Sequence, residues 1–343
     1  MVKKLLRTNE FIIFLILVAL SIVVGVINPA FFSISTIFDT MRASIVYFIM
    51  AFGLLPIIIA GGVDISFVAI AAFTSYATHM FLIGRGYQGG ILLYYVIACG
   101  LGVLAGLLNG FLVTRFNLPI FDVSLAMYTM WYGFVLFFIG ATANFDMPAG
   151  TVGYYGRFIL TAKDPFVGNT GLHVSILYVI ALGVFIWWLL KYTTIGRGVY
   201  AIGGNKEVAI RSGFNVKRIL LIIFGIMGIF SAIAGVTQGF LSRNFSPVVF
   251  INQPLDVLAA VILGGAAITG GRGTVIGTVL GVILIQVINR ALILTGIPVE
   301  WQRLVVGLIL ILFTSIPALR ERRARRIGHT TADEYIREIT QAG

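Results

Sequence analysis

A short polar break, Ile59-Ala60-Gly61-Gly62-Val63-Asp64-Ile65-Ser66, interrupts long apolar stretches. Paired glycines end a helix readily because glycine adopts left-handed backbone geometry, and Asp64 can then accept hydrogen bonds as the N-cap of the next helix. A helix end beside a polar cavity can line a pathway through a membrane. The candidate pathway residues are therefore Gly61, Gly62, Asp64 and Ser66. The alternative is a loop at the cytoplasmic surface in which Asp64 is only a cap.

Four other acidic residues lie within or beside apolar stretches: Asp39, Asp122, Asp256 and Glu300. Ionisable groups inside a bilayer are costly and usually face a bundle interior, a partner group or water. Asp122 and Asp256 each follow a proline closely, so each falls in the first turn of a helix, where an acid offsets the helix dipole. Capping therefore competes with a pathway role, and the acids show no proton-relay pattern.

The sequence offers no catalytic or metal-binding constellation. His79 and His173 lie in different apolar stretches without a cysteine or carboxylate companion, so ordinary packed histidines are favoured over a metal site. No G-x-x-x-x-G-K-[ST] phosphate loop is present, and Gly271-Arg272-Gly273 precedes an apolar stretch instead of linking a soluble strand to a helix. We therefore expect a chain that is not an enzyme and binds no cofactor or metal itself. If ATP drives it, the ATPase is a separate chain.

Composition sets the environment in which these residues act. Of the 343 residues, 59% are hydrophobic and 11% are charged, whereas soluble domains carry about 25% charged residues. So few charges cannot cover a folded chain of this size, and lipid must be the outer solvent. A soluble enzyme, a disordered chain and a disulfide scaffold are excluded, the last because Cys99 is alone. The net charge of +11 does not indicate nucleic-acid binding, because the basic residues punctuate apolar runs.

Ten apolar stretches meet or approach the roughly 20 residues that a spanning helix needs. They are 11–27, 43–60, 65–83, 92–113, 119–141, 173–190, 217–239, 255–270, 274–294 and 301–319. The third begins at the Gly-Gly break and the eighth is short, so each is either a span or a re-entrant half-helix. The predicted fold is an all-α, polytopic transmembrane helical bundle. Residues 1–319 form one membrane domain, and 320–343 form a basic tail.

Charge asymmetry predicts the orientation, because Lys and Arg accumulate in cytoplasmic loops. With ten spans and a cytoplasmic N-terminus, 17 of the 24 Lys and Arg residues lie on the cytoplasmic side. Both termini are therefore expected in the cytoplasm. The basic cluster at 320–326 is expected to anchor the chain near anionic headgroups, with partner binding as the alternative.

Two apolar stretches carry glycines four residues apart, a spacing that lets helix backbones approach closely. These candidate packing residues are Gly102, Gly106, Gly110, Gly273, Gly277 and Gly281. In addition, Ile59-Ala60-Gly61 recurs 174 residues later as Ile233-Ala234-Gly235. Five helices per repeat would invert the second copy, and two inverted five-helix repeats are typical of transporters.

The most distinctive polar segment is the loop 191–217. Gly203-Gly204-Asn205 predicts a turn and a cap, residues 206–212 predict a short helix, and Gly213 predicts its end. A helix of two turns is not stable alone in water. It must dock either on this protein's own bundle or on a cytoplasmic partner.

Three stretches, in consistent order along the chain, carry a likeness to a known family. They are Gly61–Ser66; Thr194–Lys217, with Gly196-Arg197, Tyr200-Ala201-Ile202-Gly203-Gly204-Asn205 and Ser212-Gly213; and Asp256–Thr278, with Gly264-Gly265 and Gly270-Gly271-Arg272-Gly273. They resemble the permease subunits of bacterial binding-protein-dependent ABC sugar importers of the ribose, galactofuranose and autoinducer-2 type. Phe67-Val68 stands where that family usually has Val-Gly, so a common pentose substrate is not assumed.

The resemblance implies a non-catalytic permease of the bacterial inner membrane that forms the pathway for a sugar or sugar-like solute. It also implies a cytoplasmic ABC ATPase that uses ATP and Mg²⁺, a periplasmic or lipid-anchored sugar-binding protein, and a second permease copy or paralogue. The residues that would couple the permease to the ATPase are Gly203, Gly204, Asn205, Lys206, Glu207, Arg211 and Gly213. An ion-coupled secondary transporter of a small polar solute is the alternative, motivated by the apparent repeat and the membrane acids.

Overall fold

The computed structural model describes residues 9–164 and 168–296, together with 298, 301, 304, 307, 308 and 311. The chain divides into two units, of which the first, Met1–Gly296, holds nearly all of the described residues. Within the tenth predicted span, 301–319, the five described residues are all helical. The basic tail, 320–343, and Glu300 lie outside the described residues.

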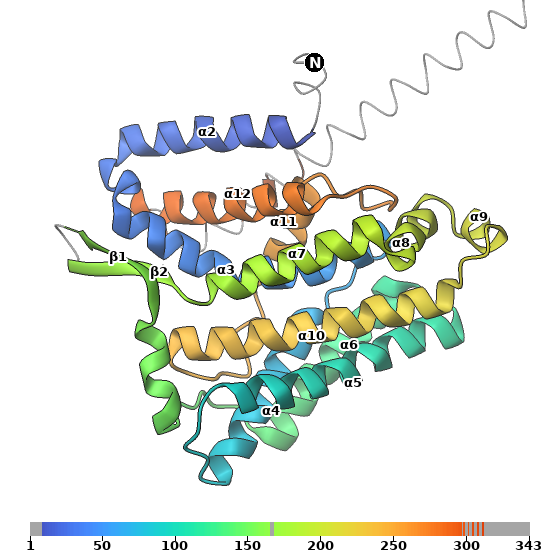
Figure 1. Ribbon diagram of the computed structural model, residues 1–343, viewed down its shortest axis with the longest axis horizontal. Coiled ribbons are helices and arrows are strands. Elements are labelled where there is room, and N and C mark those ends of the chain that lie inside the picture. Colours follow the sequence, from blue (N-terminus) through green and yellow to red (C-terminus); the bar gives the residue numbers. More distant parts are fainter. Residues whose placement is uncertain are drawn as a thin grey trace, which may run out of the picture. The chain divides into compact units, whose positions relative to one another are not determined.

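The first unit is built almost entirely of helices (Figure 1). They are α2 (Asn9–Ile27), α3 (Ile34–Ile59), α4 (Phe67–Gly84), α5 (Leu92–Phe116), α6 (Ile120–Phe134), α7 (Ile176–Tyr192), α8 (Thr194–Gly204), α9 (Lys206–Arg211), α10 (Val216–Ser242), α11 (Pro254–Leu263) and α12 (Val275–Leu294). The shorter elements are the 3-10 helices η1 (Pro29–Phe32) and η3 (Ala149–Gly156) and the π-helix η2 (Val135–Ile139). Two strands, β1 (Phe158–Asp164) and β2 (Gly168–His173), form an antiparallel hairpin.

Seven helical segments in the described part of the chain are long and apolar enough to cross a membrane, and α7 with α8 makes an eighth if this pair, bent by 72°, is one span. Of the two doubtful spans, α4 has 18 residues but α11 has only 10. At 1.5 Å per residue, α11 covers about 15 Å, half of a bilayer core of about 30 Å. The predicted count of ten spanning helices is therefore not reached among the described residues. The stretch 255–270 contains a half-helix.

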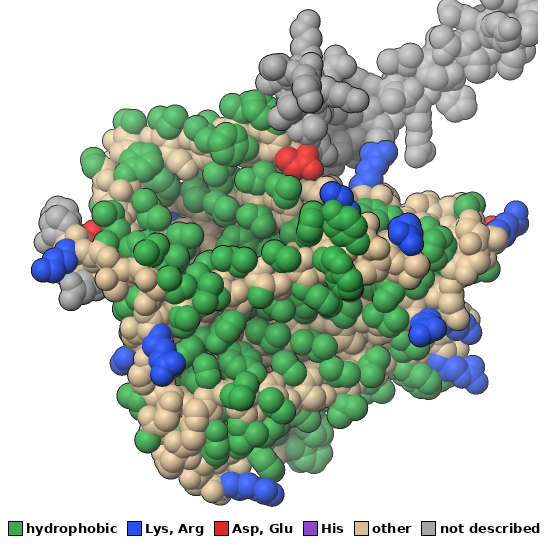
Figure 2. Space-filling view, in the orientation of Figure 1, with side chains coloured by type: hydrophobic (Ala, Val, Ile, Leu, Met, Phe, Trp, Pro, Cys, Tyr) green, Lys and Arg blue, Asp and Glu red, His purple; other side chains and the backbone are tan. Residues whose placement is uncertain are grey.

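The core of this unit lies around α3, α4 and α10. In their most apolar windows, α3 is 83% and α10 is 72% buried, whereas α2 is only 11% buried. Figure 2 shows apolar side chains over the visible face between two ends where Lys and Arg gather. This pattern fits a bundle with lipid around its middle and water at its ends.

The hairpin β1–β2 is an element that the all-helical prediction missed. It lies in the stretch 142–172, which the sequence marked only as non-spanning. Its register runs from Phe158 opposite His173 to Asp164 opposite Gly168. Asp164 is buried and accepts a hydrogen bond from the Ser35 backbone N–H at 3.3 Å, which ties the hairpin to the start of α3. Counting apolar stretches finds spanning helices but cannot register a strand pair of six or seven residues.

The repeat inferred from Ile59-Ala60-Gly61 and Ile233-Ala234-Gly235 is wrong at these positions. Gly61 follows the end of α3 with a φ of 86°. Gly235 lies inside α10, against the backbone of Ala71. Equivalent residues of a repeat would share a backbone conformation, so this match reflects the ease with which short apolar triplets recur.

Candidate functional site

The break between α3 and α4 forms a buried polar turn. Asp64 and Ser66 are both 0% exposed. Asp64 Oδ1 accepts hydrogen bonds from the Ser66 backbone N–H at 2.7 Å and from the Ser66 hydroxyl at 2.6 Å. Because α4 begins only at Phe67, Asp64 closes a turn onto Ser66 and does not cap the helix. The prediction that Asp64 is the N-cap is therefore corrected, whereas the alternative of a loop on the cytoplasmic side stays a prediction.

The same turn holds a residue that sequence reasoning missed. Asn109 of α5 is 1% exposed, and its Nδ2 donates to the Ser66 hydroxyl at 2.7 Å. Asp64 Oδ2 and Asn109 Oδ1 are buried without a hydrogen-bond partner. A buried acceptor without a partner costs about 1–3 kcal/mol. These two oxygens can therefore each accept a hydrogen bond from a hydroxyl group or a water molecule. The only sequence signal was a single asparagine inside an apolar helix.

Backbones from three distant segments meet next to this turn, and we call Gly61, Gly203, Gly270 and Gly271 the glycine junction. The Gly271 N–H donates to the Ile59 carbonyl at 2.8 Å. A Cβ added to Gly270 would lie 2.8 Å from the Cα atoms of Gly203 and Gly61. A Cβ added to Gly203 would overlap the Ile59 carbonyl and the Gly271 nitrogen. We call Gly61-Gly62, after α3, and Gly270-Gly271, before α12, the two glycine breaks. The predicted coupling loop contacts both of them through backbone atoms alone.

The predicted coupling loop is more helical than expected. Gly203 and Gly204 form the last residues of α8 instead of a turn. Asn205 caps α9, as predicted, because its Oδ1 accepts hydrogen bonds from the backbone N–H groups of Glu207 at 2.9 Å and Val208 at 3.1 Å. Gly213 follows with a φ of 85°, where a side chain would be strained.

The helix α9 exposes both charged and large apolar side chains. Lys206, Glu207 and Arg211 are exposed, and Ala209 is the buried residue of this helix. Val208 and Ile210 are 56% and 55% exposed. A six-residue helix that leaves two large apolar side chains uncovered is not held by its own core packing.

The glycines spaced four apart lie at two helix contacts. Gly102 and Gly106 of α5 pack against the backbone of α10, with Gly110 beside Leu221 of the same helix. Gly277 and Gly281 of α12 pack against the backbone of α11, at Gly264 and Ala260. Gly273 precedes α12 and packs beside Ile59.

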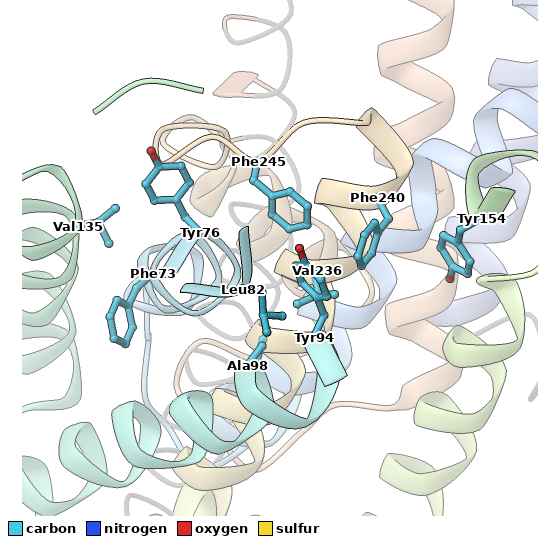
Figure 3. Packing of buried hydrophobic residues seen from close by; sticks show 11 residues of the cluster. Phe73, Tyr76, Leu82, Tyr94, Ala98, Val135, Tyr154, Val236, Phe240 and Phe245 are labelled. Carbon is cyan, nitrogen blue, oxygen red and sulfur yellow. The ribbon is translucent and has the colours of Figure 1, made fainter. Parts of the chain in front are cut away.

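Where the end of α4 meets the start of α5 and the end of α10, large side chains fill the contacts between helices (Figure 3). We call His79, Tyr94, Phe240 and Phe245 the aromatic cluster. The His79 ring stacks on Phe245 with centroids 4.1 Å apart, and its Nε2 and Nδ1 lie 2.9 Å from Asn144 Oδ1 and 3.1 Å from the Tyr94 hydroxyl. Backbone hydrogen bonds of 2.9 Å in both directions pair Asn144 with Phe245. His79 is thus a packed, hydrogen-bonded histidine that links two loops.

His173 has a comparable role at the end of β2. It is 0% exposed, and its Nε2 lies 2.9 Å from the Tyr154 carbonyl. The Ser175 backbone N–H donates to its Nδ1 at 3.1 Å. Burial lowers the pKa of His173; the hydrogen bond to the Tyr154 carbonyl offsets part of this effect, and Arg42 adds the smallest contribution, which also lowers it. The neutral ring therefore satisfies both of its nitrogens.

Comparison with known proteins places this fold. Residues 36–314 match the family model described as "Branched-chain amino acid transport system / permease component". The chain belongs to this family. It is 31% identical to the "Ribose import permease protein RbsC" of Bacillus subtilis, over 87% of this chain and 89% of that one. It is 32% identical to the "Galactose/methyl galactoside import permease protein MglC" of Haemophilus influenzae, over 92% and 95% of the two chains. No solved structure matches it.

These comparisons bear on the predicted class of protein. The relatives are import permease proteins, which confirms the predicted multi-pass permease and favours it over the ion-coupled carrier. The resemblance stated from the loop and the glycine breaks is confirmed as well. The individual roles of the Asp64 turn and the coupling loop remain predictions.

Proposed function

We propose that this chain is the permease subunit of an ABC importer and forms the pathway for a sugar or sugar-like solute. The family description speaks of branched-chain amino acids, whereas the names of the relatives speak of ribose, galactose and methyl galactoside. The sugar permeases match this chain over about nine tenths of their length. Their names therefore support a sugar as the solute.

The observation that carries the ATP-driven mechanism is the exposure of two large apolar side chains on α9. Val208 and Ile210 project from a short capped helix at an end of the bundle that is rich in basic residues. Binding in a groove of a cytoplasmic ATPase would bury these two side chains and stabilise the short helix. Its neighbour Gly203 touches the backbone of Ile59 and Gly271, so a displacement of α9 reaches both glycine breaks directly.

The complete importer then needs components that this chain does not supply. A separate ATPase binds and hydrolyses ATP with Mg²⁺, and this chain binds no cofactor and catalyses no reaction. A periplasmic or lipid-anchored binding protein delivers the solute, and a second copy or a paralogue completes the membrane part. The chain lies in the bacterial inner membrane with both termini in the cytoplasm.

Reconstitution tests the proposal. Proteoliposomes that contain this chain, its ATPase and its binding protein should take up labelled D-ribose or D-galactose only with ATP and Mg²⁺. Uptake by this chain alone, or uptake that a protonophore abolishes at constant ATP, would contradict it.

The variant Asn205→Ala tests the coupling helix. It removes the cap of α9 and, at about 1 kcal/mol, should weaken copurification of the ATPase about fivefold. Asn205→Asp keeps a capping oxygen and serves as the matched control. Equal ATPase binding by the two variants would contradict the assignment of α9.

A further inference from the structure

Polar side chains gather along one side of the α3–α12 pair. On α3, Asp39, Ala43 and Tyr47 follow one another at intervals of four residues and therefore share a face. On α12, Gln286 and Arg290 are also four residues apart. We call these five residues the α3–α12 strip. Asp39 and Arg290 are charged residues of two helices whose most apolar windows both have a mean hydropathy of 2.0.

Contacts between the two helices show that the strip is continuous. Arg290 Nη2 lies 3.2 Å from Asp39 Oδ2. Tyr47 lies beside Gln286 and within electrostatic range of Asp256, in the first turn of α11. α2 packs along a different side of α12, where Val24 contacts Val287. Asp39 and Ala43 are exposed, Tyr47 and Arg290 are partly buried, and Gln286 is buried, so the strip is open to its surroundings at the end that holds Asp39 and Ala43.

The strip reaches the middle of the membrane. Tyr47 is 12 residues from the end of α3 at Ile59, and Gln286 is 11 residues from the start of α12 at Val275. At 1.5 Å per residue these separations are about 18 and 17 Å, close to half of a core of about 30 Å. The half-helix α11 begins beside them. Half-helix ends at this depth are where transporters bind their solutes.

The strip also has unused hydrogen-bonding groups. Gln286 is 5% exposed, and its Nε2 has no partner at full hydrogen-bonding geometry, although it lies close enough to Tyr47 to interact with the phenol. Lipid cannot satisfy an amide donor. Polar groups inside a span normally face a partner or a water-filled path.

We infer that the α3–α12 strip lines the solute pathway, where Gln286 donates to hydroxyl groups of the solute. This inference rests on the proposed function and adds the chemistry of its substrate. The unused groups of the strip are the neutral amide donor of Gln286 and the Nε of Arg290, whose positive charge is balanced by Asp39 through its Nη2. They fit a neutral polyhydroxylated solute and offer no unpaired charge to the ammonium and carboxylate groups of an amino acid.

Cysteine accessibility tests whether the strip faces water. Cys99 is the only native cysteine, so Cys99→Ser gives a silent background. In that background, Ala43→Cys should react with a membrane-impermeant, hydrophilic thiol reagent at least ten times faster than Val18→Cys. Val18 of α2 is nine residues from the end of its helix at Ile27, as Ala43 is nine residues from the start of α3 at Ile34. Both sites are exposed, so the comparison separates water from lipid. Equal rates would overturn the inference.

A second pair of variants tests the solute contact. Gln286→Leu removes the unused amide, and Thr78→Val removes another buried hydroxyl without a partner, on α4. With D-ribose and D-galactose as probes, Gln286→Leu should lower ATP-dependent uptake about tenfold at equal amounts of inserted protein, whereas Thr78→Val should stay within twofold of wild type. Equal uptake by the two variants would overturn the contact. Absence of ATP-dependent uptake by the wild type would instead contradict the proposed function. The cysteine reaction rates would still decide whether the strip is accessible to water.

Discussion

The glycine junction, which precedes α4, and the aromatic cluster, which includes His79 near the end of α4, are held together by different means. At the junction, the backbones of Gly61, Gly203 and Gly270 touch with no side chain between them. In the aromatic cluster, His79 and Phe245 interlock with their neighbours, and the nitrogens of His79 both face polar partners. The first contact tolerates no added atom, whereas the second depends on the atoms that it has.

This difference predicts a division of labour. Interlocked rings in a close-packed core resist displacement, because each has several neighbours to move. Backbones in direct contact pass a displacement of one segment on to the next. They have no interlocking side chains that would hold the segments in one relative position. We therefore expect substitutions in the aromatic cluster to act mainly on stability, and substitutions in the junction to act mainly on coupling between ATP hydrolysis and transport.

The largest expected effect on stability belongs to Phe245→Ala. Phe245 is 2% exposed and contacts His79, Tyr94 and Phe240. Its loss leaves a cavity and should destabilise the protein by about 3–5 kcal/mol, measured as a fall in thermal unfolding temperature in detergent. Phe137→Ala is the control, because Phe137 is 82% exposed. The protein that still folds should transport the same amount of solute per ATP; a changed ratio would contradict the division of labour.

The second prediction reverses the pattern. In Gly203→Ala the new methyl group meets backbone atoms of Ile59 and Gly271, which cannot rotate away as a side chain would. Overpacking of this kind costs about 1–3 kcal/mol, less than Phe245→Ala. Solute transported per ATP hydrolysed should nevertheless fall at least tenfold, because the contact between α8 and both glycine breaks is displaced.

Gly204→Ala provides a matched control for this variant. Gly204 is the next residue of the same helix, and a Cβ there would meet nothing within 4 Å. The control should keep wild-type coupling. Equal coupling in the two alanine variants would show that the glycine junction does not transmit the motion.

The sequence predicted those parts of this picture that depend on neighbouring residues. Asn205 and Gly213 predicted the cap and the end of α9, and Pro254 predicted the start of α11. The stretches of the spanning helices followed from composition. The place of Asp64 was missed by a small shift, because α4 begins three residues later than the acid and the chain turns onto Ser66 first.

What the sequence could not predict depends on residues that are distant along the chain. Gly203 carries no mark that it meets Gly61 and Gly270, since the meeting requires α8 to end against two other breaks. Tyr47 and Gln286 lie on helices that are distant along the chain and form no motif until α3 and α12 pack. Their pairing is a property of the fold, not of spacing.

The smallest expected effect is a pH dependence from the end of the molecule that carries the aromatic cluster. The neutral His173 ring donates from Nε2 to the Tyr154 carbonyl, while its Nδ1 lies 3.1 Å from the Ser175 backbone N–H, which donates to it, and 2.9 Å from the Ser175 hydroxyl, so a proton added at Nδ1 would face that N–H group. Burial and Arg42 hold the pKa of His173 below its usual value. The unfolded chain, with an ordinary histidine pKa of about 6.5, then binds this proton more readily. Stability from this residue is complete above that pH and falls as the pH drops below it, by at most about 1.4 kcal/mol per pH unit.

His173→Gln removes this titration and gives the measurement its reference. Between pH 7.5 and 5.5, the unfolding temperature of the wild type should fall more steeply than that of the variant, while the difference between them at pH 7.5 stays constant up to pH 8.5. Solute transported per ATP should show no such difference at pH 6, because the glycine junction contains no titratable side chain. Parallel unfolding curves would contradict the assignment of a neutral, fully bonded ring to His173. A pH-dependent coupling ratio that disappears in His173→Gln would instead show that the two regions are not independent.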